Sequence, residues 1–260
     1  MNFDALTPAI LLPALIAGLL VTATHVPLGM QVLARGIVFI DLAVAQIAGV
    51  GVILADAMGW APQGAAVQVA AFSAALAGAL LLTWTERRWP QVQEAIIGVV
   101  FVLASSIAIL LLAHNPHGGE HLKELLAGQI LWVEPARLAV DALIYAVLLL
   151  IWFGLGKRLG RIGFYVLFAC AVTVSVQLVG LYLVFATLVV PALATYYARG
   201  RRHLKAYAVG VCGYAIGLAG SALADLPSGA MIVCAMVACG IVLAFFGAGR
   251  GQLRRDGDFD

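Results

Sequence analysis

Charged residues are scarce in this chain of 260 residues: only 11% are Asp, Glu, Lys or Arg, whereas 63% are hydrophobic. Soluble globular domains carry about 25% charged residues, so the composition excludes an ordinary soluble fold. The apolar runs are about 20 residues long and do not alternate over about ten residues, which excludes a membrane β-barrel. We therefore predict an all-α fold, a polytopic bundle of about eight or nine transmembrane helices.

Motifs for catalysis and cofactor binding are also missing. There is no Walker motif, nucleotide-binding loop or hydrolase nucleophile, so we expect no enzyme and no permanently bound cofactor. The net charge of +2 gives no reason to expect nucleic acid as a partner. The N-terminus lacks a basic region, so we expect a retained first helix and not a cleaved signal. The four cysteines show no disulfide or zinc spacing and all fall within apolar segments, at Cys170, Cys212, Cys234 and Cys239.

Nine apolar segments divide the chain. We expect one transmembrane domain over residues 1–250 and a short cytoplasmic tail over 251–260. The long apolar run from 162 to 198 contains no polar turn, and Gly180 is the only residue at which it can divide. We expect Pro191 to break the second part of this run. The predicted spans are approximately 8–31, 37–57, 62–85, 94–113, 138–156, 162–179, 181–198, 206–224 and 228–248.

The basic residues predict the orientation of these spans. Only Lys123 and Arg137 fall on one side, whereas the others occupy alternate loops and the C-terminal tail. Loops rich in Lys and Arg stay in the cytoplasm, so we expect the N-terminus outside and the C-terminus inside. The cytoplasmic group comprises Arg35, Arg87, Arg88, Lys157, Arg158, Arg161, Arg199, Arg201, Arg202, Lys205, Arg250, Arg254 and Arg255.

The span over 37–57 contains an acid. A carboxylate within a membrane helix costs about 2.5–3.5 kcal/mol on insertion scales, so Asp41 marks a candidate functional site. An alternative is that Asp41 lies close to the cytoplasmic end of the helix, where it reaches the lipid headgroups or pairs with Arg35. Gln46 lies about 16 Å beyond Arg35, near the midplane. We expect Asp41 to be the only anionic group on a path through the spans, with Gln46 as a weaker oxygen ligand.

The longest outer loop, residues 114–138, begins with a group of imidazole and carboxylate side chains. Such groups are ligands for zinc and related divalent ions, so the loop is a candidate for metal capture. A solvated flexible turn is the alternative, because the glycines Gly118 and Gly119 lie within the group. The candidate ligands are His114, His117, Glu120 and His121.

Four stretches in this order resemble the permeases of zinc, manganese and iron ATP-binding-cassette (ABC) importers. LPSGAMIV (226–233) also resembles the start of the last helix in that family. The four stretches are PLGMQVLARGIVFIDLAVAQIAGVGVILA (27–55), EAIIGVVFVLASSIAILLL (94–112), LKELLAGQILWV (122–133) and VGLYLVFATLVVPALAT (179–195).

The resemblance implies a multi-pass protein of the inner (plasma) membrane that forms a homodimer or heterodimer. It implies a separate cytoplasmic ATPase, a periplasmic metal-binding protein, and a divalent metal ion as the transported substrate. It also implies a metal site on the second helix, where the family has Asp followed four residues later by His. Asp41 matches the acid, but Ala45 stands at the histidine position, beside Gln46.

A second departure concerns the loop before the sixth span. The family carries an acidic segment there that docks on the ATPase, whereas this chain has the short basic stretch 154–164. We expect Lys157, Arg158 and Arg161 to make this contact if an ATPase is coupled. The alternatives are a carrier or facilitator without an ATPase and, less in keeping with the residues, an intramembrane enzyme using Asp41, Gln46 and His25.

Overall fold

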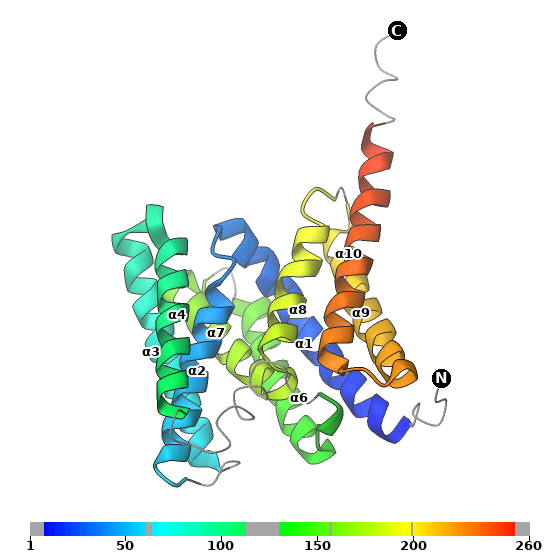
Figure 1. Ribbon diagram of the computed structural model, residues 1–260. Helices are drawn as coiled ribbons and strands as arrows, with labels where there is room; N and C mark the ends of the chain where they lie inside the picture. Colours follow the sequence, from blue (N-terminus) through cyan, green and yellow to red (C-terminus); the bar gives the residue numbers. More distant parts are fainter. Residues whose placement is uncertain (1–7, 61–63, 113–129, 156–157, 199, 253–260) are drawn as a thin grey trace.

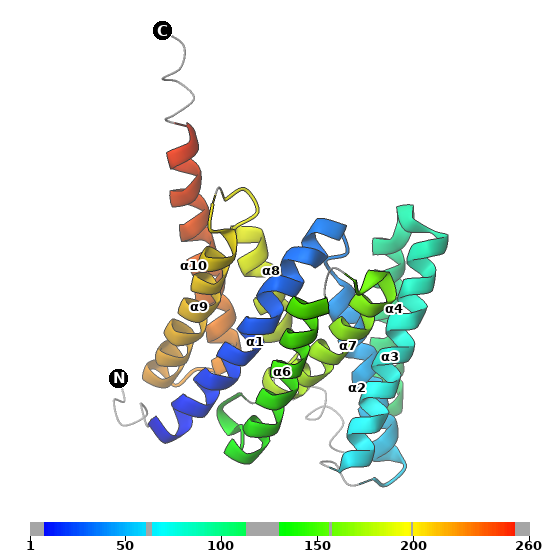
Figure 2. The same cartoon turned by 180° about the vertical axis from the view of Figure 1, so that it is seen from behind.

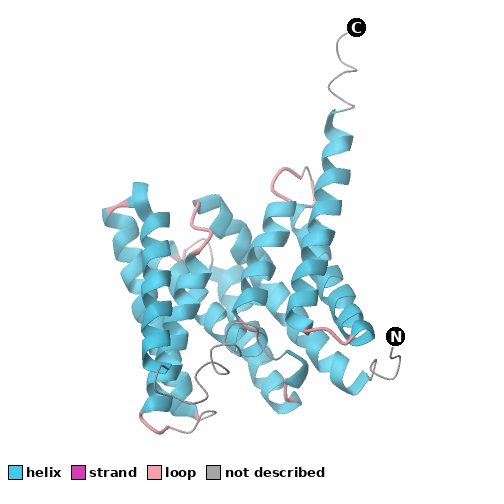
Figure 3. Ribbon diagram, in the orientation of Figure 1, coloured by secondary structure: helices cyan, strands magenta, loops and turns pink. Residues whose placement is uncertain are grey.

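The computed structural model describes residues 8–60, 64–112, 130–155, 158–198 and 200–252. Within these ranges the chain is helical and contains no strand (Figures 1 and 3). The helices are α1 (Pro8–Arg35), α2 (Ile40–Ala57), α3 (Ala65–Arg88), η2 (Pro90–Val92), α4 (Gln93–Leu112), η3 (Ile130–Trp132), α6 (Pro135–Leu155), α7 (Gly160–Val179), α8 (Leu181–Ala194), α9 (Arg202–Ala224) and α10 (Ser228–Gln252).

Eight of the described helices are long and apolar enough to cross a membrane. The ninth, α8, has 14 residues. At about 1.5 Å per residue it is about 21 Å long, which is less than the hydrocarbon thickness of about 30 Å. The prediction of an all-α bundle with eight or nine spans is therefore confirmed.

The long apolar run divides at Gly180, as predicted. Gly180 has φ 84°, a backbone conformation that residues with a Cβ rarely adopt, and it separates α7 from α8. The prediction that Pro191 breaks the second part was wrong, because α8 continues to Ala194. The packed bundle keeps the rest of the helix in place, and the Pro191 carbonyl accepts a hydrogen bond from Thr195 Oγ1 at 2.8 Å.

Helix α7 forms the centre of the bundle. Within the 18-residue apolar stretch that could cross a membrane, 72% of α7 is buried. The corresponding share is 22% for α4, 22% for α6 and 17% for α10. On one side of α7, α2 packs against α3 and α4, and on the other side α10 packs against α9 and α8 (Figures 1 and 2). The peripheral helices expose large apolar side chains, such as Leu110, Leu150 and Phe245, to the membrane.

Small residues allow the helices to approach closely, as is typical of membrane bundles. A Cβ at Gly217 of α9 would overlap the backbone of Ile232 in α10. A Cβ at Gly29 of α1 would likewise overlap the carbonyl of Leu188 in α8. A side chain at either position would force the two helices apart.

Apart from Arg137, the described basic residues lie toward one end of the bundle, from which the C-terminal part of α10 projects (Figure 1). Helices α1 and α3 end there, and α2, α4 and α7 begin there. We call this the basic end, and it is defined by Arg35, Arg87, Arg88, Arg161 and Arg202. The alternation of the helices agrees with the predicted placement of basic residues in alternate loops.

Candidate functional site

Asp41 is the second residue of α2, and it is 0% exposed. Neither carboxylate oxygen has a hydrogen-bond partner in the described part of the chain. The backbone amides of Asp41 and Leu42 are the polar groups nearest to these oxygens. A buried carboxylate without a compensating partner is costly, so this position is unusual for a purely structural acid.

The turn between α1 and α2 carries Asp41 into the bundle. Gly36, with φ 70°, ends α1, and its N–H donates to the Leu33 carbonyl at 3.3 Å. The next residue, Ile37, is buried, and its carbonyl accepts a hydrogen bond from Ile40 N–H at 3.2 Å. The chain therefore re-enters the core before α2 begins, and the first turn of α2 lies among packed helices.

Arg35 is not the partner of Asp41. Its guanidinium lies over the ring of Phe164 in α7, 3.9 Å from the ring centroid. The charge that attracts it most is Glu86 of α3. The predicted pairing of Asp41 with Arg35 is therefore wrong, because Arg35 lies against Phe164 and near Glu86. Asp41 does lie at the start of its helix, as that alternative expected.

Gln46 does not share the face of Asp41. The two positions are about 140° apart around the helix. Gln46 is on the stripe of Val50 and Ile53, which pack against Ala108 and Leu112 of α4. Asp41 is on another stripe, with Ala45 and Ala48 of the main core. The structure brings Asp41 and Gln46 onto one helix but not to one site.

A second carboxylate lies at the same end of the bundle. Glu94, the second residue of α4, accepts a hydrogen bond through Oε1 from the Phe39 N–H at 3.3 Å. Its Oε2 is buried without a hydrogen-bond partner in the described residues. Asp41 and Glu94 are close enough to interact electrostatically. Sequence reasoning missed Glu94, because it starts an apolar segment and looks like an ordinary acid of a helix first turn.

Another acid within a span was also missed. Asp141 of α6 is 7% exposed, so the expectation that Asp41 alone is acidic within the spans was wrong. Asp141 lies 3.8 Å from Nε of Arg137, one turn earlier, and Arg137 donates to Gln177 Oε1 of α7 at 3.1 Å. The sequence could have revealed this pair, because Arg137 and Asp141 are four residues apart and so face each other on a helix.

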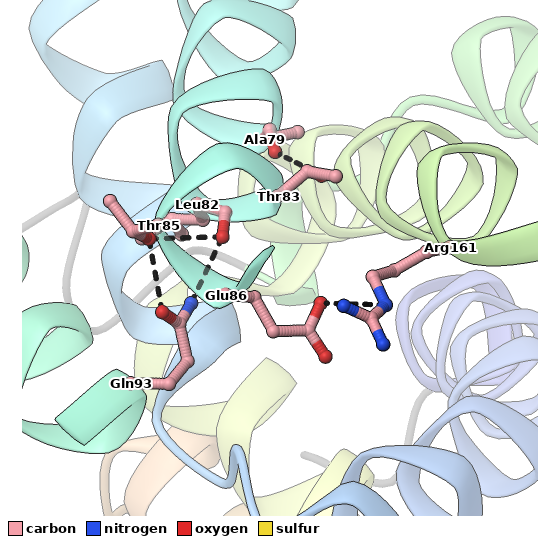
Figure 4. A network of polar contacts seen from close by, with 7 residues as sticks. All are labelled: Ala79, Leu82, Thr83, Thr85, Glu86, Gln93 and Arg161. Carbon is pink, nitrogen blue, oxygen red and sulfur yellow. Dashed lines mark hydrogen bonds and ion pairs between the residues drawn. The ribbon is translucent and has the colours of Figure 1, made fainter. Parts of the chain in front are cut away.

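The basic residues expected to contact an ATPase differ in their surroundings. Arg161 forms an ion pair with Glu86 of α3, with 3.6 Å between Nε and Oε2 (Figure 4). Arg158 is exposed in the short connection between α6 and α7. Lys157 lies outside the described residues. Arg161 therefore ties α7 to α3, and Arg158 is the described residue free to face a partner.

A polar cluster next to this pair joins α3 to the start of α4. Thr85 Oγ1 donates to Gln93 Oε1 at 3.0 Å, and Gln93 Nε2 donates to the Leu82 carbonyl at 3.0 Å (Figure 4). Both side chains are buried. These bonds fix the start of α4, and with it the position of Glu94.

The remaining candidate metal ligands are the histidines and Glu120. His114, His117, Glu120 and His121 all lie outside the described residues. His25 is buried in α1, with Nδ1 3.0 Å from the Val21 carbonyl and from Thr24 Oγ1. Among the described residues, no group of three or more His, Cys, Asp or Glu side chains could hold a metal ion. Any ion bound near Asp41 therefore has at most two acidic ligands from this part of the chain.

Comparison with solved structures shows the fold. PsaBC from Streptococcus pneumoniae, solved in complex with a Fab, matches with a TM-score of 0.76 and 18% identity over 95% of each chain. A metal-chelate type ABC transporter in an inward-facing conformation matches with a TM-score of 0.59 and 17% identity, over 93% of this chain and 84% of that one. The arrangement of α1 to α10 is therefore the fold of these two proteins.

Comparison of sequences agrees with the fold. An uncharacterized membrane protein of Synechocystis is 30% identical over an alignment 257 positions long, and the match covers 89% of each protein. The model of the ABC 3 transport family matches residues 8–162 and 153–247. These matches include every helix from α1 to α9 and most of α10, and the family is one of transport proteins. This multi-pass membrane protein therefore belongs to the ABC 3 transport family.

Proposed function

We propose that this chain is the permease subunit of an ABC importer for divalent metal ions, with zinc or manganese as the transported ion. Membership of the ABC 3 transport family supports a permease role. A metal ion as substrate is supported by the fold shared with a metal-chelate type transporter. The observation that carries the proposal is the buried, unpaired carboxylate of Asp41 within a membrane helix.

Asp41 supplies what a dication needs on its path. A divalent ion that loses its water within the bilayer requires anionic or strongly polar ligands, because transfer of the bare charge is prohibitive. Asp41 is available for this role because no cation of the described chain neutralises it. Gln46 lies about 140° from Asp41 around α2, so the site works without it, and Ala45 contributes no ligand. We expect weaker binding of zinc than an Asp–His pair provides.

The remaining parts of the importer are separate proteins. ATP is hydrolysed by a cytoplasmic ATPase, and a periplasmic metal-binding protein delivers the ion to a dimer of permease subunits in the inner membrane. The N-terminus lies outside and the C-terminus in the cytoplasm, as the basic residues indicate. His114, His117, Glu120 and His121 concentrate metal at the outer entrance. Lys157 and Arg158 face the ATPase.

One observation favours a second candidate, a carrier that works without an ATPase. Only residues 156–159 separate α6 from α7, and Arg161 is engaged with Glu86. This leaves a small surface for docking. The importer and the carrier differ in whether metal uptake requires ATP.

The test is uptake of radioactive zinc and manganese into vesicles that contain the permease and its co-purified ATPase. We expect ATP-dependent uptake that Asp41→Asn lowers by at least about tenfold, since loss of one anionic ligand is worth more than about 1.4 kcal/mol. Asp56→Asn, at the other end of α2, is the matched control and should leave uptake unchanged. Normal uptake by Asp41→Asn would contradict the metal path, and uptake without ATP would support the carrier.

A further inference from the structure

Asp41 and Glu94 are the second residues of two helices, α2 and α4, whose starts lie side by side. The link between them is the Phe39 N–H, which precedes α2 and donates to Glu94 Oε1 at 3.3 Å. The Val38 amide also lies near the Glu94 carboxylate. Glu94 therefore reaches over the turn that delivers Asp41 into the bundle, and the two carboxylates interact electrostatically.

Three of the four oxygens of these carboxylates are buried without a hydrogen-bond partner in the described residues: Oδ1 and Oδ2 of Asp41 and Oε2 of Glu94. The nearby cations have other partners. Arg35 lies over Phe164, and Arg161 pairs with Glu86. The described side chains therefore supply no positive charge to these two carboxyl groups, and a bound cation would stabilise both in their ionised form.

We propose that Asp41 and Glu94 together form a divalent-cation site between the starts of α2 and α4, with Glu94 as the second ligand in place of Gln46. Two carboxylates neutralise the charge of one dication. Carboxylate and water oxygens suit manganese and magnesium, whereas imidazole favours zinc. The site therefore accepts manganese, and it prefers zinc over manganese by less than a site with a histidine does. This inference rests on the proposed function and names the ligands and the ion.

A purely structural role for Glu94 can be separated from this one. Glutamine at position 94 keeps a carbonyl oxygen that accepts the Phe39 N–H, but it removes the charge. Alanine removes both. If Glu94 only holds the turn, Glu94→Gln should behave like the wild type. If it binds a dication, Glu94→Gln should lose affinity although the protein stays folded.

The experiment measures binding of manganese(II) alone to the purified full-length permease in nanodiscs, by electron paramagnetic resonance, with zinc(II) as competitor. We expect one manganese site in the wild type. Affinity should fall at least about tenfold in Glu94→Gln, be lost in Asp41→Asn, and be unchanged in Asp56→Asn. A melting temperature of Glu94→Gln equal to that of the wild type would show that the lower manganese affinity is not caused by a folding defect.

Two outcomes would overturn the inference. Binding by Glu94→Gln with wild-type affinity would assign Glu94 to the turn alone, and uptake that still depends on Asp41 would leave the proposed function standing. Absence of manganese and zinc binding in the wild type would also overturn the inference. In that case, uptake that is insensitive to Asp41→Asn would remove the proposed function as well.

Discussion

Two buried acids of this protein, Asp41 and Asp141, have opposite surroundings. Asp141, 7% exposed in α6, has Arg137 one turn away, and Gln177 of α7 holds Arg137 in place. Asp41, 0% exposed in α2, has another carboxylate, Glu94, as its charged neighbour. Burial alone therefore does not mark a functional acid. The useful observation is whether the protein supplies a positive charge, and at Asp41 the described residues supply none.

The largest effect on stability should come from breaking the compensated pair. Arg137→Ala leaves Asp141 buried without its counter-ion, which costs about 1–3 kcal/mol once the partial exposure of Arg137 is allowed for. Asp41→Asn removes an uncompensated charge, so its melting temperature should equal or exceed that of the wild type. Fluorescence-monitored melting in detergent measures both.

The matched variant for this comparison is Arg137→Ala combined with Asp141→Asn, which should recover part of the lost stability. A melting temperature unchanged by Arg137→Ala would mean that Asp141 needs no counter-ion. The contrast between the two acids would then lose its meaning.

A smaller effect should come from exchanging charges at the basic end. Arg161→Glu places a second carboxylate beside that of Glu86, and the repulsion should lower the melting temperature by a few degrees. Glu86→Arg combined with Arg161→Glu should restore it, because the pair is re-formed in reverse. Stimulation of the ATPase by each variant separates the role of Arg161 from that of Arg158.

If Arg161 is only the partner of Glu86, the exchanged pair should restore stimulation as well as stability. Recovery of stability without recovery of stimulation would return Arg161 to the docking surface. Arg158→Glu, which breaks no ion pair of the described chain, should reduce stimulation without changing the melting temperature.

The smallest effect should come from the outer loop. Replacing His114, His117 and His121 together by alanine should lower metal uptake about two- to fivefold at limiting metal and leave it unchanged at saturation, because these side chains raise only the local concentration. Uptake as a function of metal concentration measures this. Equal uptake at every concentration would identify the loop as a solvated turn.

The helices could be predicted from sequence because each is a long apolar run ending at a charge or a glycine. The division at Gly180 could be predicted because this glycine is the only residue of the apolar run 162–198 at which the chain can leave the helix between α7 and α8. The partners of the charged residues could not be predicted. Glu86 and Arg161 are 75 residues apart, and Phe39 and Glu94 are 55 apart, so no local pattern links them. Asp141 is different: its counter-ion is four residues away and could have been recognised.

Helix α7 joins the two ends of the bundle mechanically. Arg161 at its start is bound to α3, and Gln177 near its end is bound to Arg137 of α6. These residues are 16 positions apart, about 24 Å along a continuous helix without an internal proline. A displacement of the turn between α6 and α7 would therefore be carried along this one helix to the opposite end of the bundle, where Gln177 holds Arg137.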